Sequence, residues 1–198
     1  MEGTRPPVRE SIDFARIVAF TDGVFAIAIT LLVLSLGVPP DLPGSELREF
    51  LADSWRQLFA YFLSFAVIGR FWIGHHRVFA MLHDFDRRLM MLNLAYLSLI
   101  VLIPFPTELL GDYSESTEAT VIYAVVVGTA SLANWALLRY ALRRGHVAPE
   151  ARGPATRLPA RMLQPAIVFY ASIPVAFLSP EIAKLVWLGM LLGVSRRR

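Results

Sequence analysis

The chain has 198 residues, of which 56% are hydrophobic and 18% are charged, and this balance is far from that of a soluble domain of the same length. The composition therefore predicts an integral membrane protein of the all-α class. Because the chain has no cysteine, disulfides, thiolate catalysis and cysteine-ligated metals are excluded. The basic residues lie at the ends of apolar stretches rather than in one patch, which argues against nucleic acid as a partner.

Six apolar stretches approach the length of about 20 residues that a helix needs to cross a bilayer. They cover residues 16–36, 57–79, 89–110, 118–142, 161–178 and 181–194. We therefore expect residues 1–198 to form a single domain with six transmembrane helices. The last two stretches are the shortest and are joined only by Ser179 and Pro180, and Pro104-Phe105-Pro106 predicts a local break near the end of the third.

Charged residues between these stretches alternate in sign along the chain. Arginines precede the first stretch, flank the connections after the second and the fourth, and end the chain, whereas the first and third connections are mainly acidic. Since basic residues mark the cytoplasmic side of a membrane protein, this pattern predicts cytoplasmic termini and an even number of crossings.

A charged residue, Asp22, lies in the first third of the first apolar stretch. A charged side chain inside a membrane costs free energy, so its presence suggests a functional site. His75 and Asn93 lie at a similar depth in the next two stretches, within roughly 10 Å of the same membrane face by helical rise. We expect these groups, with Arg16 and Thr21, to satisfy one another, either as a structural clasp between helices or in proton or ion transfer.

The same first stretch carries Ile27, Thr30 and Leu34 at positions i, i+3 and i+7, which places them on one face of a helix. If several copies surround a symmetry axis, each position becomes a ring: an isoleucine collar, a ring of hydroxyls and a leucine collar. The alternative is that Ile27 and Leu34 pack or face lipid and that Thr30 bonds back to its own helix.

A metal site can be drawn from His75, His76, His83, Asp84 and Asp86. Adjacent histidines point to different faces of a helix, however, and the other three residues belong to a polar turn, so we expect no metal. The chain has no Walker loop, dinucleotide-binding glycine pattern or nucleophile elbow, and no paired carboxylates within its apolar stretches. We therefore expect neither an enzyme nor a cofactor.

The first stretch reads RIVAFTDGVFAIAITLLVL from Arg16 to Leu34 and resembles the Arg-x-x-x-Phe-Ser-Asp signature of the transmembrane protein 175 family of lysosomal potassium channels, in its prokaryotic single-repeat form. The likeness continues through FWIGHHR at residues 71–77, RR at 87–88 to Asn93, and IPFPT at 103–107. Thr21 replaces the serine of the signature, which keeps the hydroxyl but adds a methyl group.

This resemblance implies a potassium-permeable channel without a glycine-tyrosine-glycine filter, formed by four copies of the chain around their first helices. It matches Ile27, Thr30 and Leu34 to pore-lining positions, with Ile27 at a hydrophobic constriction and Thr30 associated with cation selectivity. It matches a second set to a packing and hydrogen-bond network: Arg16, Phe20, Thr21, Asp22, Trp72, His75 and Asn93.

We therefore expect a homotetramer in the lipid bilayer of a prokaryotic cytoplasmic membrane that conducts potassium ions passively. Two alternatives stay open. One is a proton-coupled carrier that uses Asp22 and His75, and the other is a membrane scaffold without transport.

Overall fold

The computed structural model describes residues 8–37, 39, 41–156 and 158–193. Within these ranges the regular elements are helices, supplemented by an isolated antiparallel bridge between Leu82 and Val147. The remaining residues, including both chain ends and residue 194 of the sixth predicted helix, lie outside the described part. The expectation of an all-α protein is confirmed.

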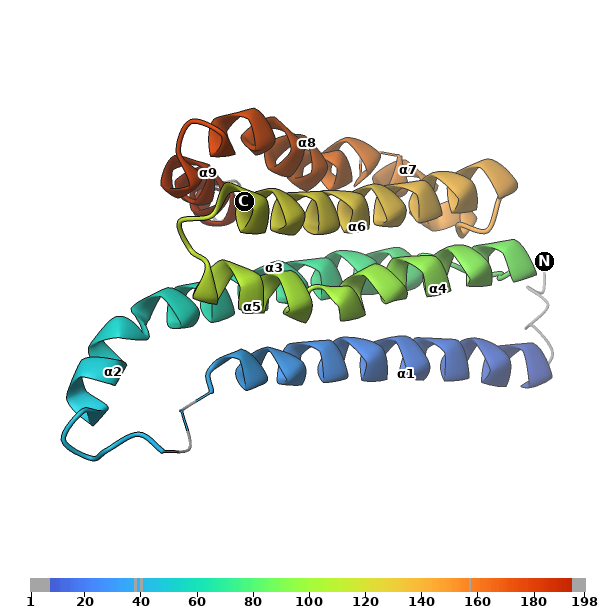
Figure 1. Cartoon of the computed structure of the whole chain (residues 1–198). Coiled ribbons are helices and arrows are strands. Elements are labelled where there is room, and N and C mark those ends of the chain that lie inside the picture. The colour runs from blue at the N-terminus through green and yellow to red at the C-terminus, as the bar shows by residue number, and fades with distance from the viewer. Residues whose placement is uncertain (1–7, 38, 40, 157, 194–198) are drawn as a thin grey trace.

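The long helices lie side by side along a common direction (Figure 1). In chain order the elements are α1 (Val8–Leu31), η1 (Leu32–Ser35), α2 (Leu47–Asp53), α3 (Trp55–Phe79), α4 (Arg87–Leu102), α5 (Pro104–Asp112), α6 (Thr117–Arg144), η2 (Pro149–Ala151), α7 (Arg152–Ala155), α8 (Leu158–Ala176) and α9 (Pro180–Gly193). α1 contacts α3 and α4, α4 contacts α6, and α6 packs on α8, so α1 forms one side of the molecule and the α8–α9 pair the other.

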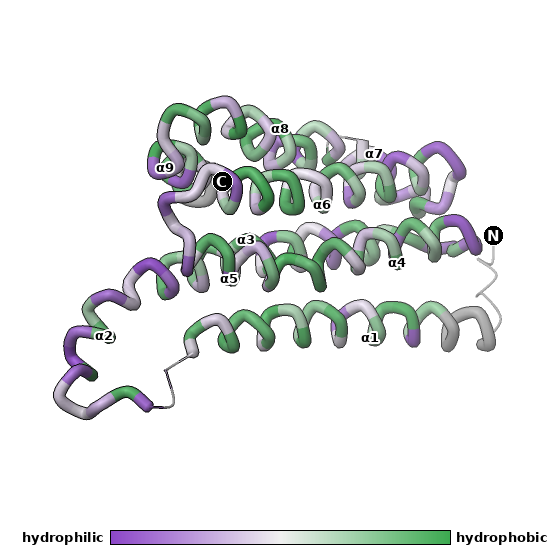
Figure 2. Tube along the Cα trace, viewed as in Figure 1, coloured by the Kyte–Doolittle hydropathy of each residue, from purple (hydrophilic) through white to green (hydrophobic). Residues whose placement is uncertain are grey.

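Four segments of the described chain are long and apolar enough to cross a membrane. They are Phe14–Ser35, Trp55–Phe79, Arg87–Asp112 and Thr117–Arg144. Figure 2 shows that these helices are mostly hydrophobic along their length, with hydrophilic residues gathered towards the ends of the bundle and in α2. The structure thus supports a polytopic membrane protein with four candidate spans. Any further crossing in the described chain would be made by α8 or α9.

The element boundaries differ from the sequence expectation at three places. α1 begins at Val8 rather than Arg16, and α2 occupies part of the first connection. The connection between α6 and α8, which follows the fourth predicted stretch, contains the short helices η2 and α7. These differences reflect helices too short or too polar to stand out as membrane segments.

The third predicted stretch is divided at Ile103 into α4 and α5, as the Pro-Phe-Pro motif predicts. Pro104 and Pro106 have no backbone N–H to donate to the preceding turn, so the regular α-helical pattern is interrupted there. The carbonyl of Ile100, to which Pro104 cannot donate, accepts instead from the N–H of Ile103 at 3.2 Å.

The core covers only one face of α1. Thr21, Phe25, Ala28 and Leu32 of this helix and its η1 extension are buried at spacings of three and four residues. Only 22% of the most apolar window of this span is buried, against 39% to 50% for the other three spans. α1 is therefore the least covered of the four, and its opposite face is available for lipid or for another copy of the chain.

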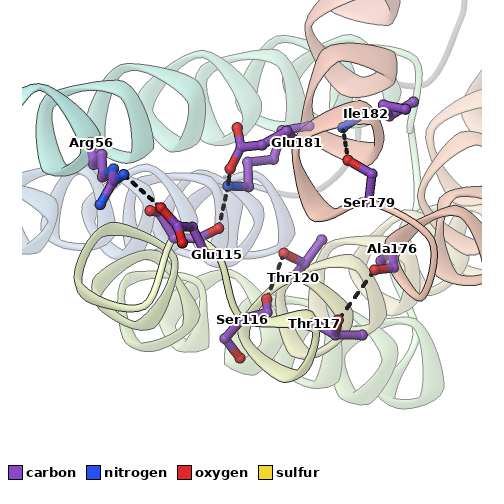
Figure 3. A network of polar contacts seen from close by, with 11 residues as sticks. Arg56, Glu115, Ser116, Thr117, Thr120, Ala176, Ser179, Glu181 and Ile182 are labelled. Atoms are coloured by element: carbon purple, nitrogen blue, oxygen red, sulfur yellow. Dashed lines mark hydrogen bonds and ion pairs between the residues drawn. The ribbon is translucent and has the colours of Figure 1, made fainter.

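A polar network at the opposite end of the bundle from the α3–α4 turn ties the α8–α9 pair to the rest (Figure 3). Arg56 at the start of α3 forms an ion pair of 2.7 Å with Glu115, which lies in the connection between α5 and α6. The buried Lys184 of α9 donates to the carbonyl of Ser114 and to Glu181, the latter at 2.6 Å. At this end an ion pair therefore links α3 to the α5–α6 connection, and Lys184 links α9 to the same connection through a backbone carbonyl.

The close packing of α6 on α8 gives a first prediction. A Cβ atom at Gly128 would lie 2.9 Å from Cε2 of Tyr170, whose hydroxyl is held 2.8 Å from Thr129 Oγ1. Gly128→Ala should destabilise the fold by about 1–3 kcal/mol through overpacking. The better helix propensity of alanine should offset up to about 1 kcal/mol of this cost. The midpoint of thermal unfolding in detergent should fall. Gly189→Ala, with open space around the glycine, should leave it unchanged or raise it; equal midpoints for the two variants would contradict the prediction.

Candidate functional site

A stripe of exposed residues runs along the uncovered face of α1. Ile27 is 57% exposed, Leu34 is 73% exposed, and Thr30 between them is also exposed. Leu34 lies in η1, the 3₁₀ turn that continues the helix. The stripe extends towards the N-terminus through Gly23 and Phe20, the latter 56% exposed. The three residues singled out in the sequence therefore share one face that the described part of the chain does not cover.

The hydroxyl of Thr30 donates a hydrogen bond to the carbonyl of Ile27 at 2.9 Å. The back-bonding considered from the sequence therefore occurs in the single chain. This bond uses the only hydroxyl proton and leaves the oxygen's remaining lone-pair capacity to accept from water or to face a cation. Back-bonding and a place in a pore are thus compatible, because the exposed Thr30 oxygen still has capacity to accept.

Behind the stripe, three buried side chains join α1, α3 and α4. His75 Nε2 donates to Asn93 Oδ1 at 2.9 Å, and Asn93 Nδ2 donates to Thr21 Oγ1 at 3.0 Å. Each of the three residues is at most 2% exposed. The amide of Asn93 is the centre of this row of hydrogen bonds. Its oxygen accepts from His75 of α3, and its nitrogen donates to Thr21 of α1.

His75 also lies within a group of aromatic rings. Its imidazole is stacked on Phe79 at 4.1 Å and on Tyr96 at 5.3 Å between ring centroids, and Phe25 of α1 lies 5.8 Å away. The ring is therefore fixed by packing on its faces and by Asn93 at its edge, which gives α1 a defined surface to rest on.

Asp22 takes a different partner from the one expected. Its carboxylate accepts a hydrogen bond of 2.9 Å from Trp72 Nε1, and the Trp72 ring lies 5.6 Å from that of His76. Of the expected cluster, the imidazole of His75 and the amide of Asn93 are therefore joined, whereas the carboxylate of Asp22 bonds to Trp72. Two separate contacts hold α1, and the described contacts of both leave out Arg16, which is exposed near the start of the span.

Two of the predicted network residues thus lie apart from the hydrogen bonds. Phe20 is exposed on the same stripe as Ile27, and Arg16 is exposed one turn before it. The sequence could not separate these residues from the buried ones because it does not show which face of α1 meets α3 and α4. Trp72, which the family resemblance matches to the packing and hydrogen-bond network, is the residue that pairs with Asp22.

The histidines and aspartates considered for a metal do not form such a site. Among the described residues, no group of three or more His, Asp or Glu side chains is arranged to hold a metal ion. His75 is enclosed by aromatic rings, and Asp86 instead accepts from the backbone N–H of Leu89 at 2.7 Å, which caps the start of α4. The sequence missed one contact here: Asp84 and Asp86 both face His146, which is far along the chain.

These features define a polytopic helical membrane protein whose first span is braced on one face and open on the other. A family model described as "Endosomal/lysosomal potassium channel TMEM175" matches residues 16–104, which hold both faces of α1 and both contacts behind it. A potassium channel of Streptomyces collinus is 42% identical over 148 residues, covering 72% of this chain and 71% of that one. The chain belongs to the TMEM175 family.

Other relatives are matched over smaller shares of their length. A potassium channel of Chamaesiphon minutus is 40% identical over 121 residues, or 60% of each chain. The endosomal/lysosomal proton channel TMEM175 of Gallus gallus is 32% identical over 145 residues, or 67% of this chain and 29% of that one. The chain thus spans less than two thirds of either relative.

Solved structures of the family have the same fold. The crystal structure of a lysosomal potassium-selective channel TMEM175 homolog from Chamaesiphon minutus superposes with a TM-score of 0.82 at 28% identity, covering 93% of this chain and 97% of that one. A variant of the potassium channel MtTMEM175, in complex with a nanobody fusion protein, superposes with a TM-score of 0.63 at 16% identity, covering 98% and 94%, and supports the fold alone.

The buried chain of hydrogen bonds gives a second prediction. Thr21→Val removes the oxygen that accepts from Asn93 and leaves a buried amide N–H without a partner, which should cost about 1–3 kcal/mol. Thr21→Ser keeps the acceptor and restores the serine of the family signature, so it should stay closer to the wild type. Thermal unfolding of both variants in detergent measures the difference, and a valine variant as stable as the wild type would remove this bond from the brace.

Proposed function

We propose that the protein is a potassium-permeable cation channel in which four copies place the exposed stripe of α1 around a central axis. The observation that carries this proposal is the pairing of an uncovered apolar stripe with a fully braced opposite face, within the segment that matches the family model. The named potassium channels among the relatives support potassium as the permeant ion.

In this assembly each position of the stripe becomes a ring. Ile27 forms the narrow apolar collar, Thr30 supplies four hydroxyl oxygens one turn further, and Leu34 forms a second apolar collar. Apolar collars pass ions only when they are wetted, so conduction depends on their diameter and on the water they admit. The Thr30 oxygens, whose protons are donated to Ile27 carbonyls, offer partial replacement for a cation's hydration shell.

The polar contacts behind the stripe act as a brace rather than as part of the ion path. Asn93, His75 and Trp72 hold α1 against α3 and α4 from the side opposite Ile27. Since a ring of four side chains narrows or widens with any rotation of α1, this brace sets the pore diameter. A carrier that uses Asp22 and His75 together has less support, because the two side chains have different partners.

We also propose six crossings, with α8 and α9 as the last two and both chain ends in the cytoplasm of a prokaryotic cell. The support is that arginines gather at one end of the antiparallel bundle: Arg77, Arg87, Arg88, Arg143, Arg144 and Arg161. Figure 2 shows the hydrophilic ends of α4 and α6 on that side. A basic end is typical of the cytoplasmic face.

The assembly can be tested because the chain has no cysteine of its own. A single Leu34→Cys substitution should place four thiols around the axis, so mild oxidation in membranes should give disulfide-linked dimers. Ile167→Cys, at an isoleucine of α8 that is 64% exposed, serves as the control and should stay monomeric on a denaturing gel. Native mass spectrometry of the wild type should show a tetramer, and a stable monomer would overturn the pore.

Conduction is tested by potassium flux into liposomes under a potassium gradient alone. In Ile27→Asn a polar ring should lower the barrier to wetting the collar, so single-channel conductance should rise and the preference for potassium over sodium should fall. Ile167→Asn makes the same substitution at an exposed position away from α1 and should change neither quantity. Unchanged conductance in a folded, tetrameric Ile27→Asn protein would remove Ile27 from the pore.

A further inference from the structure

The turn between α3 and α4 is joined to the end of α6 by backbone hydrogen bonds. Gly145, with φ at +82°, ends α6 and directs the chain back towards this turn. The N–H of His83 then donates to the carbonyl of His146 at 3.0 Å, and the N–H of Ala148 donates to that of Met81 at 2.9 Å. We call this contact between residues 81–86 and 145–148 the inner junction.

At the inner junction a buried histidine lies between two carboxylates. His146 is 6% exposed, its Nδ1 lies 3.3 Å from Asp84 Oδ2, and its Nε2 lies 3.2 Å from Asp86 Oδ2. Each ring nitrogen therefore faces a carboxylate from the opposite segment. Asp86 is itself held in place, because the Tyr140 hydroxyl donates to it at 2.6 Å and the N–H of Leu89 donates at 2.7 Å.

These fixed positions make the junction sensitive to one proton. A neutral imidazole has a single N–H and can donate to only one of the two carboxylates, which leaves a lone pair facing the other. In the structure the Nδ1–Asp84 contact has hydrogen-bond geometry, and Nε2 lies near Asp86 without it. An imidazolium carries a second N–H, on Nε2, which can donate to Asp86. The hydrogen bond from the Tyr140 hydroxyl and then that from the Leu89 N–H lower the pKa of Asp86, so this carboxylate keeps its charge near neutral pH.

Other charged groups surround the histidine from each neighbouring element. Arg88 of α4 and Arg144 of α6 lie 5.7 Å and 5.8 Å from the centre of the Tyr140 ring. A Cβ atom at Gly145 would lie 3.5 Å from Nη2 of Arg152 in α7. His83, next to Asp84, is exposed. Asp84 and Asp86 are the carboxylates that touch the ring, and the arginines lie around the Asp86–Tyr140 pair.

We propose that His146 is a proton-responsive clasp: its protonated form joins the α3–α4 turn firmly to the end of α6, and loss of the proton loosens this junction. α3 and α4 carry the side chains that hold α1 in place. A change at the turn between these two helices therefore affects the position of α1 and of its exposed stripe. Regulation of the current by pH at this end of the bundle rests on the proposed channel function, whereas the clasp itself does not.

Hydrogen–deuterium exchange on the full chain in nanodiscs tests the clasp directly. After correction for intrinsic exchange rates, peptides covering residues 81–90 and 144–150 should be about tenfold better protected near pH 6 than near pH 8, as expected for one added hydrogen bond to a charged group. His146→Gln should abolish this difference. The exposed His83→Gln should keep it, and equal protection of the wild type at the two pH values would overturn the clasp.

A second variant covers the case in which His146→Gln does not fold. Asp84 is largely exposed, with 66% of its side chain accessible, so Asp84→Asn should fold and should reduce the difference in protection between the two pH values. A full wild-type difference in Asp84→Asn would also overturn the two-carboxylate clasp.

Potassium currents provide the functional arm. Current through the wild type should change when the pH is moved between 6 and 8 on the side of the membrane that faces the arginine-rich end of the bundle. Asp84→Asn should reduce this change. Wild-type current that does not respond to pH, with exchange that does, would overturn the regulation and keep the clasp. Absence of any potassium flux at either pH would count against the channel and leave the exchange result standing.

Discussion

The hydrogen bond between Asn93 and Thr21 is the contact on which the candidate site depends, because it fixes which face of α1 meets the protein. An unpaired amide in an apolar environment costs several kcal/mol, so rotation of α1 away from Asn93 is opposed by more than the loss of packing. Phe25, Ala28 and Leu32 then pack on the same side. With that face fixed, Ile27 and Leu34 have no position in the single chain other than an exposed one.

The shape of this polar cluster bears on what it can do. Thr21, Asn93 and His75 belong to three different helices and lie at similar depth, so their hydrogen bonds run across the bundle. A proton relay through a membrane needs groups at successive depths, as helical rise is about 1.5 Å per residue. Asp22 does not extend this row of hydrogen bonds at either end, since its hydrogen-bond partner is Trp72. The geometry of these side chains therefore favours a brace over a proton relay.

The parts of the fold that the sequence predicts are those that depend on local physics. Apolar length predicts the helical spans, and two prolines without N–H donors predict the break at Ile103. Helical rise alone places Thr21, His75 and Asn93 at one depth. Rotation about a helix axis is a tertiary property, however, and a single sequence does not show it. For this reason the sequence alone does not separate Arg16 and Phe20, which are exposed in the single chain, from the buried Thr21.

Contacts between distant segments are the other part that local pattern misses. Asp84 and Asp86 have the composition of a polar turn, and His146 follows a helix end, so neither segment indicates the other. The bridge between Leu82 and Val147 holds the turn after α3 beside the chain that follows α6, and neither segment's own pattern shows it. The same holds for Asp22 and Trp72, whose pairing requires α1 to lie on α3. In both cases a carboxylate within or beside an apolar bundle is satisfied by a ring N–H from a distant segment, which makes helix packing itself the condition for satisfying the charge.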